Sequence, residues 1–160
     1  MTRRVFFSFD LESDLSRVDQ IRNELVAADV DQAGFFDPAE YERVMRNDKG
    51  TIRRMIRERV AGTSVTLVLI GSDTASRPFV HLGIEESIAN RNGFLGIHIH
   101  GIDDQDGECS YSGPRPILPA EVEFQSYIWD WDLENLRREI EAAGRRADRW
   151  RAERPVGSRG

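Results

Sequence analysis

The chain has 160 residues, with 28 acidic and 22 basic side chains and a net charge of −6, which fits one domain of ordinary size. A composition of 39% hydrophobic and 31% charged residues argues against a disordered or fibrous protein. The acid excess argues against nucleic-acid binding, and no apolar run is long enough to predict a membrane span. Lys49 is the only lysine, so any lysine-dependent chemistry has only this residue to use.

Two further counts bear on location and charge distribution. A single cysteine, Cys109, excludes an internal disulfide, and residues 1–4 lead straight into a strand-like stretch without a signal peptide. Both observations predict a cytoplasmic protein. Residues 137–160 carry eight arginines and four acids, so this end is basic while the rest of the chain is acidic.

The first half of the chain predicts two strands and three helices. A short aromatic and β-branched run predicts a buried strand, and the polar residues Asp10 to Asp14 after it predict a loop. Apolar residues at helical spacing then predict a helix from Asp14. The remaining predicted elements, with the first strand at 5–9, are a strand at 33–36 stopped by Asp37, and helices at 41–45 and 52–60, the latter closed by Gly62.

The second half predicts three strands and two helices. Residues 64–70 are apolar almost throughout, which is typical of a central parallel strand covered on both faces. A polar segment, 101–119, is long for a loop in a compact domain, and long loops are often functional. The other predicted elements are a helix from about Pro78 through Ile88, strands at 94–99 and 124–129, and a helix from Leu133 through Ile140.

This alternation of strands and helices predicts the α/β class. Specifically, we expect a doubly wound, five-stranded parallel sheet with helices on both faces, as in flavodoxin-like folds. The expected organisation is a domain over 1–131, a C-terminal helix over 132–150 that completes it, and a flexible tail over 151–160.

In such a fold, ligands bind beyond the carboxyl ends of the strands. The helix that begins near Pro78 points its free N–H groups at this edge, where they favour a phosphate. The sequence therefore predicts a nucleotide-sized crevice whose rim acids hold ribose hydroxyls. The alternative is that these acids are ordinary turn and cap residues. The residues predicted at this edge are Phe9, Asp10, Asp14, Asp37, Gly71, Ser72, His100, Asp103 and Asp104.

A phosphorylated receiver domain has a similar strand order. It needs an acceptor aspartate at the end of the third strand and a lysine at the end of the fifth. Here these strands end in Gly71-Ser72 and in Trp129-Asp130. The sequence therefore disfavours a receiver.

Several short motifs occur in an order that resembles one family. They are Val5-Phe-Phe-Ser-Phe9, Gly34-Phe-Phe-Asp37, the stretch 62–71, Phe79-Val80 with Ile84, Leu95-Gly-Ile-His-Ile99 and Gly113-Pro-Arg-Pro116. Over about residues 3 to 130 the chain resembles the TIR-like, ThsB-like proteins of the bacterial Thoeris antiphage system and their relatives of unknown function. The resemblance implies a TIR-like fold of the flavodoxin type.

The resemblance also implies a function. Active members of the family use NAD as substrate, without a metal, and make a cyclic ADP-ribose-type signal that activates a separate effector protein. Phe9 and Asp10 would then line the pocket, with Asp37 at its rim. From their positions, Ser72 at the end of the third strand and Arg77 and His81 near the start of the following helix are expected to meet the nucleotide.

The chain departs from the family at one position. The family pattern Trp-Val-x-x-Glu-Ile carries a glutamate, whereas residues 79–84 here read Phe-Val-His-Leu-Gly-Ile, with Gly83 in its place. Gly83 is predicted to line the nucleotide pocket by leaving room for the ligand, and the alternative is that it marks a lost catalytic site. Glu86 lies one helical turn farther on the same face and is the predicted substitute, whereas Glu85 points roughly to the opposite side. The alternative is that both acids are solvated surface residues.

Two hypotheses therefore stand side by side. In the first, the protein is an NAD-consuming signalling enzyme, and in the second it is a catalytically silent TIR-like module that binds a nucleotide or a partner. His98 and His100 alternate on one strand face and supply at most half of a metal site, so we expect no metal. Assembly of several copies remains open.

Overall fold

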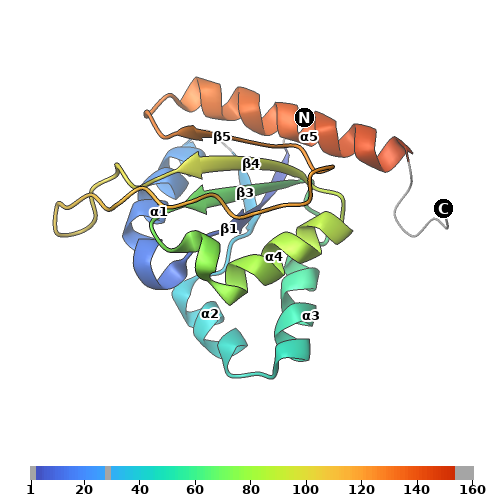
Figure 1. Cartoon of the computed structure of the whole chain (residues 1–160), viewed down its shortest axis with the longest axis horizontal. Helices are drawn as coiled ribbons and strands as arrows, with labels where there is room; N and C mark the ends of the chain where they lie inside the picture. Colours follow the sequence, from blue (N-terminus) through green and yellow to red (C-terminus); the bar gives the residue numbers. More distant parts are fainter. Residues whose placement is uncertain (1–2, 28–29, 154–160) are drawn as a thin grey trace.

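The computed structural model describes residues 3–27 and 30–153 and shows a parallel sheet between two layers of helices (Figure 1). The strand order is β2-β1-β3-β4-β5, and every neighbouring pair is parallel. The predicted α/β class with a parallel sheet is confirmed. The strands are β1 (Arg4–Ser8), β2 (Asp31–Gly34), β3 (Val65–Ile70), β4 (Gly93–His98) and β5 (Phe124–Ile128).

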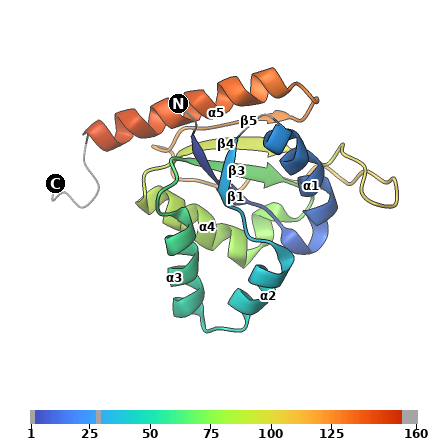
Figure 2. The same ribbon diagram turned by 180° about the vertical axis from the view of Figure 1, so that it is seen from behind.

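The helices divide between the two faces of the sheet (Figures 1 and 2). Helices α1 (Leu11–Ala27) and α5 (Leu133–Glu153) share one hydrophobic core with β1, β3 and β4. Helices α2 (Pro38–Met45), α3 (Lys49–Val60) and α4 (Pro78–Ala89) cover the other face over two smaller clusters. A short 3-10 turn, η1 (Thr74–Ser76), leads into α4. In the described part of the chain no helix is long and apolar enough to cross a membrane.

Three helices begin earlier than the apolar spacing predicts, because aspartates start them. The carboxylate of Asp10 accepts the N–H of Glu12 and its carbonyl accepts the N–H of Asp14, so the predicted loop over 10–14 is wrong and is the first turn of α1. Asp37 and Asp48 accept N–H groups three residues ahead and cap α2 and α3. Gly62 follows α3 with a φ of +84°, which confirms its helix-ending role.

Two other bounds differ from the prediction. Strand β2 ends at Gly34, and the two phenylalanines that follow it enter opposite cores, Phe35 beside α1 and Phe36 beside α3. Aromatic residues alone therefore mislead about where this strand lies. Helix α5 continues to Glu153, past the predicted end at 150, and residues 154–160 of the predicted flexible tail lie outside the described residues.

Helix α4 runs back across β1 and β3, antiparallel to the strands. Near its start Arg77 pairs with Asp10 beyond the end of β1, and near its end the hydroxyl of Ser87 bonds that of Thr66 inside β3. The N-terminus of α4 therefore lies at the carboxyl edge of the sheet, as predicted.

The connection from β4 to β5 contains no helix over its described residues. The predicted loop over 101–119, hereafter the strap, leaves the carboxyl edge, projects outward and returns across the α4 side of the sheet (Figure 1). Its residue Leu118, with Val122 beyond it, packs on the cluster formed by β3, α4 and Phe94. The strap thus takes the place of a covering helix at this end of the sheet.

Candidate functional site

The order of the strands reverses between β1 and β3, and this is where doubly wound sheets bind ligands. Asp10 lies at that point and is buried. Its Oδ1 accepts the N–H of Glu12 at 3.2 Å, and its Oδ2 accepts Nε of Arg77 at 3.0 Å. Asp10 therefore joins the ends of β1 and the starts of α1 and α4 in one place.

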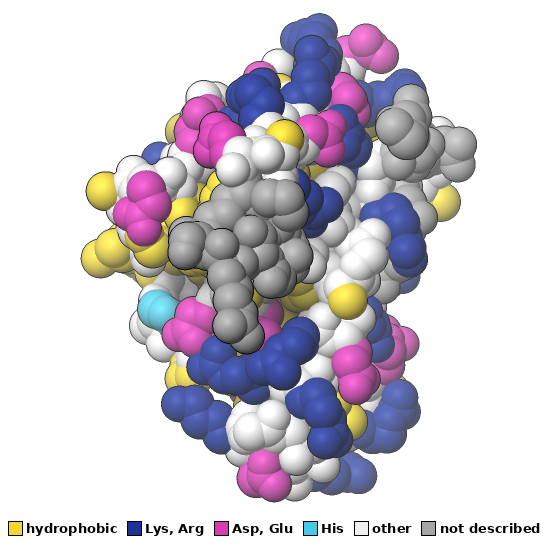
Figure 3. All heavy atoms as spheres, turned by 90° about the vertical axis from the view of Figure 1, so that its right-hand side faces the viewer, with side chains coloured by type: hydrophobic (Ala, Val, Ile, Leu, Met, Phe, Trp, Pro, Cys, Tyr) yellow, Lys and Arg dark blue, Asp and Glu magenta, His cyan; other side chains and the backbone are white. Residues whose placement is uncertain are grey.

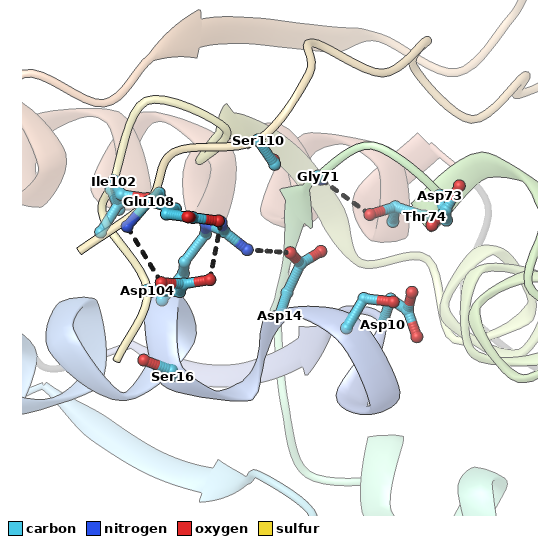
Figure 4. A network of polar contacts seen from close by, with 12 residues as sticks. Asp10, Asp14, Ser16, Gly71, Asp73, Thr74, Ile102, Asp104, Glu108 and Ser110 are labelled. Carbon is cyan, nitrogen blue, oxygen red and sulfur yellow. Dashed lines mark hydrogen bonds and ion pairs between the residues drawn. The ribbon is translucent and has the colours of Figure 1, made fainter. Parts of the chain in front are cut away.

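Asp14 lies one turn along α1 and is more deeply buried, with 1% of its side chain exposed (Figure 4). Its Oδ1 accepts Nη1 of Arg17 at 3.3 Å, whereas its Oδ2 accepts no hydrogen bond from the described residues. Burial first, and then the charge of Asp10, raise the pKa of Asp14 to about 6, against the opposing effect of Arg17. A buried carboxylate with an unused oxygen is an unusual cost, and such groups gather at functional sites.

The carboxylate of Asp14 leaves no space for a side chain at Gly71, the residue after β3. A Cβ placed on Gly71 would lie 2.0 Å from Oδ2 of Asp14. The N–H of Gly71 donates to the hydroxyl of Thr74 at 2.8 Å, which turns the chain toward α4. Gly71 therefore lets the end of β3 lie directly against the buried acid.

Arg17 connects this acid to the strap. Its Nε donates to the carbonyl of Ile102 at 2.8 Å and its Nη2 to that of Glu108 at 2.9 Å (Figure 4). Asp104, predicted at the rim, instead organises the strap, because it accepts N–H groups from Asp106 and Glu108. These N–H groups lower its pKa. Asp104 therefore stabilises a turn within the strap itself.

The strap also lies against the end of β3. Ser110 donates its N–H to the carbonyl of His100, and a Cβ on Gly113 would come within 2.1 Å of the Gly71 oxygen and 2.7 Å of the Ser72 oxygen. Only a glycine fits at 113. The predicted site residue Ser72 is thus beneath the strap.

Arg77 is the cation of the switch point. Besides Asp10, it reaches the hydroxyl of Ser13 at 3.3 Å and a carboxylate oxygen of Glu12 at 3.6 Å. The bond to Asp10 is the main cause of the raised pKa of Arg77. The structure therefore brings the predicted residues Asp10 and Arg77 together.

An aromatic cluster lies beside these charges. The ring of Phe79 makes edge contacts with Phe36 at 5.6 Å and with Tyr41 at 5.0 Å between centroids. Burial first, and then the charges of Glu12 and Asp10, raise the pKa of Tyr41. Phe79 begins α4, so the cluster and the ion pair share one helix start.

Phe79 also lines a hollow of about 480 Å³ between α3 and α4. The predicted residue His81 lies on its wall, with Nε2 at 2.5 Å from the carbonyl oxygen of Ala75. The hollow combines apolar side chains with two cations, Lys49 and Arg53, and one acid, which suits an anionic ligand with an apolar ring. Its lining residues are Met45, Lys49, Ile52, Arg53, Ser76, Pro78, Phe79, His81, Leu82 and Glu85.

Gly83 faces β1 in close contact. A Cβ at this position would lie 3.1 Å from Cε2 of Phe6 and 3.7 Å from Oγ of Ser8. The ring of Phe6 is buried, so it occupies the space that a side chain at 83 needs. Gly83 therefore lets α4 pack closely on the Phe6 ring, and its role in nucleotide binding stays a prediction.

Glu86 points to α3. Its side chain is 7% exposed, and its two oxygens accept Nε of Arg57 at 2.6 Å and Nη1 of Arg53 at 3.5 Å. Glu85 pairs with Arg53 as well, at 2.7 Å. The alternative of a merely solvated surface acid does not describe Glu86, which ties α4 to α3.

Two other predicted residues have structural partners. Phe9 is buried in the core beneath α1 and stacks on Phe35 at 5.4 Å, on the opposite face of β1 from Ser8. Asp37 caps α2, and the N–H of Glu40 lowers its pKa. Neither position brings the side chain to the Asp10–Arg77 pair in the described structure. Both roles in nucleotide binding stay predictions.

The sequence did not single out Arg17, or the contact between Tyr41 and Phe79. The position of Arg17 offered a signal, because it lies on the otherwise apolar stripe of α1 with Val18 and Ile21. Nothing in the sequence links Tyr41 to Phe79, which come together only in the fold. No group of three potential metal ligands occurs among residues 3–27 and 30–153.

The fold is a doubly wound parallel α/β domain with a charged cluster at its switch point, which is where open α/β sheets bind ligands. The family model for the Thoeris protein ThsB, TIR-like domain, matches residues 6–104. A Bacillus cereus strain MSX-D12 protein, provisionally named cyclic ADP-D-ribose synthase ThsB1, is 33% identical over 138 residues, covering 82% of this chain and 72% of that protein. The chain belongs to the Thoeris ThsB family of TIR-like proteins.

Proposed function

We propose that this protein binds NAD and converts it to a cyclic ADP-ribose-type messenger, which activates a separate effector during antiphage defence. The observation that carries the proposal is the similarity, over most of the chain, to a relative named as a cyclic ADP-D-ribose synthase. The charged cluster at the start of α4 supports it, because a helix N-terminus and an arginine suit a pyrophosphate.

The proposed reaction uses only the atoms of NAD. The bond between ribose C1′ and the nicotinamide nitrogen breaks, and its electron pair leaves with nicotinamide. A nitrogen of the adenine in the same molecule then bonds to C1′, and the positive charge passes from the pyridinium ring to the alkylated adenine. The transition state carries positive charge on the ribose, which a nearby carboxylate stabilises.

Purified protein incubated with NAD, with and without extract from infected cells, tests the proposal. We expect nicotinamide release together with a cyclic product that resists enzymes acting on linear ADP-ribose. Absence of turnover under both conditions would rule out the enzyme. Release of linear ADP-ribose alone would reduce it to a hydrolase.

The alternative function is a catalytically silent module, and Gly83 is the observation that favours it. A Gly83→Glu substitution restores the family's residue, but the Phe6 ring stands in its path. We therefore pair it with Phe6→Leu, which makes room. A silent module predicts turnover in the Phe6→Leu/Gly83→Glu protein and none in the Phe6→Leu control or the wild type.

A catalytic role for Glu86 stays a prediction, and Glu86→Gln tests it. Loss of turnover with the α3–α4 packing intact would support that role. The pair with Arg57 means that the thermal midpoint must be measured alongside activity.

A further inference from the structure

The proposed reaction needs a carboxylate at the ribose, and the carboxylates near the start of α4 are few. Glu86 and Glu85 are held by arginines of α3. Asp14 is enclosed by Gly71, Arg17 and the strap. Glu12 and Asp73 are more than half exposed, at 60% and 55% of their side chains, so water screens their charges. Asp10 is the buried carboxylate that remains.

We propose that Asp10 is the carboxylate that acts on the ribose, and that Arg77 is its resting partner, which leaves it to bind the pyrophosphate of the dinucleotide. This inference rests on the proposed function. The guanidinium of Arg77 holds Asp10 through one bond at 3.0 Å and is 36% exposed. An incoming diphosphate offers the same group two parallel acceptors, which an arginine fork matches better than one carboxylate oxygen.

Ser8 provides an independent sign that a ligand belongs here. Phe6, Ser8 and Asp10 alternate along β1 and its continuation, so they share the face that α4 covers. The Ser8 hydroxyl is buried and has no hydrogen-bond partner among the described residues. A buried hydroxyl without a partner costs free energy, which a sugar hydroxyl placed between Ser8 and Asp10 would recover.

Position along the strand fits this arrangement. Asp10 lies two residues beyond Ser8, about 6.6 Å along an extended chain. Departure of Arg77 would leave Oδ2 of Asp10 without its partner, on the same side of β1 as the unbonded hydroxyl of Ser8.

Two substitutions that break the same ion pair separate catalysis from structure. Asp10→Asn keeps the start of α1, because asparagine caps helices as well as aspartate does. We expect it to lower kcat for NAD by about 100-fold or more, with KM nearly unchanged. Arg77→Gln should instead raise KM by about 10-fold and leave kcat within about threefold. A purely structural pair predicts equal losses in both variants, and that result would overturn the proposal.

The Arg3–Glu141 pair provides a matched control, because its Nε–oxygen distance is also 3.0 Å and it joins the residue before β1 to α5 rather than to α4. Glu141→Gln should leave both kinetic constants unchanged. Asp10→Ser, which also keeps a capping oxygen, repeats the test if Asp10→Asn is unstable. An active wild type with an equally active Asp10→Asn refutes the role of Asp10 alone, whereas an inactive wild type refutes the proposed function and this inference with it.

Discussion

The two ends of the sheet differ in how their buried polar groups are hydrogen-bonded. At the amino end, Asn92 donates to the hydroxyls of Thr63 and Thr66 at 3.0 Å each, and its carbonyl accepts Nη2 of Arg151 at 2.9 Å. At the carboxyl end, an oxygen of Asp14 and the hydroxyl of Ser8 have no partner among the described residues. The side-chain amide of Asn92 is fully bonded, although Nε of the neighbouring Arg151 has no hydrogen-bond partner among the described residues, whereas the carboxyl end keeps an unbonded acid oxygen and an unbonded hydroxyl. We therefore expect the Asn92 network to serve stability, and the unbonded acid and hydroxyl at the carboxyl end to serve the proposed ligand.

Charged side chains of both signs cover the amino end of the sheet (Figure 3). Figure 3 shows the amino end, where arginine and lysine side chains alternate with acids over the surface. There, Arg151 donates to the carbonyls of Thr63 and Asn90 and so fastens the last turns of α5 beneath the sheet. The basic C-terminal stretch noted in the sequence thus acts, where it is described, in holding α5 to the domain.

The largest expected effect on stability comes from removing the hydrogen bonds of Asn92 at the amino end of the sheet. Asn92→Ala removes the shared partner of Thr63, Thr66 and Arg151, so we expect a loss of about 3 kcal/mol in the free energy of unfolding. Urea denaturation measures it. Nicotinamide release per folded molecule should not change, and a selective loss of activity would contradict the division between the two ends.

The next effect tests the close contact at the switch point. Gly71→Ala places a methyl group against Oδ2 of Asp14, 2.0 Å away before any relaxation, and should cost about 2 kcal/mol. In the Gly71→Ala/Asp14→Ala double variant the cost of the methyl group should largely disappear. Additive losses in the double-mutant cycle would show that the two residues do not touch.

A smaller effect depends on pH. The pKa of Asp14 is raised to about 6 in the folded chain, so between about pH 4 and 6 the native state binds more protons than the unfolded state. Its contribution to stability is therefore lost as pH rises through this window. Asp14→Asn should flatten that slope and raise the free energy of unfolding at pH 7 by about 1 to 2 kcal/mol. An unchanged slope in denaturation at pH 4, 5, 6 and 7 would exclude a raised pKa.

The smallest effect is at Gly83. Alanine favours a helix by up to about 1 kcal/mol over glycine, but its methyl group would press on Phe6 at 3.1 Å. Because Phe6 is buried, we expect the contact to prevail and Gly83→Ala to lower the thermal midpoint by a few degrees, about 1 kcal/mol. The same change in a Phe6→Leu background should be stabilising.

The sequence predicted the layers of this fold better than its contacts. Apolar runs such as 64–70 and periodic helices give class and order, because strands and helices bury their apolar faces in characteristic patterns. The start of α1 was missed because Asp10 to Asp14 are polar in sequence yet form a helix turn. Polarity alone does not distinguish a loop from a capped helix.

The site was predicted in part for a related reason. Strand ends put Asp10 and Arg77 at the same edge, and the structure joins them. Periodicity placed Glu86 on a face of α4 but did not reveal that this face meets the arginines of α3. The conflict between Gly83 and the Phe6 ring likewise arises from the approach of α4 to β1, which depends on packing rather than on local sequence.

The contacts that hold the strap determine which of its positions can tolerate substitution. Several contacts that hold the strap involve main-chain oxygens, namely those of Gly71, Ser72, His100, Ile102 and Glu108. Because every residue type has such an oxygen, these particular contacts make no demand on the side chains of the residues that supply them. Gly113 is a strap position that cannot vary. Arg17 of α1 holds the strap through hydrogen bonds from its guanidinium. Exposed strap positions such as Gln105 and Tyr111 are thus free to drift without loss of the fold.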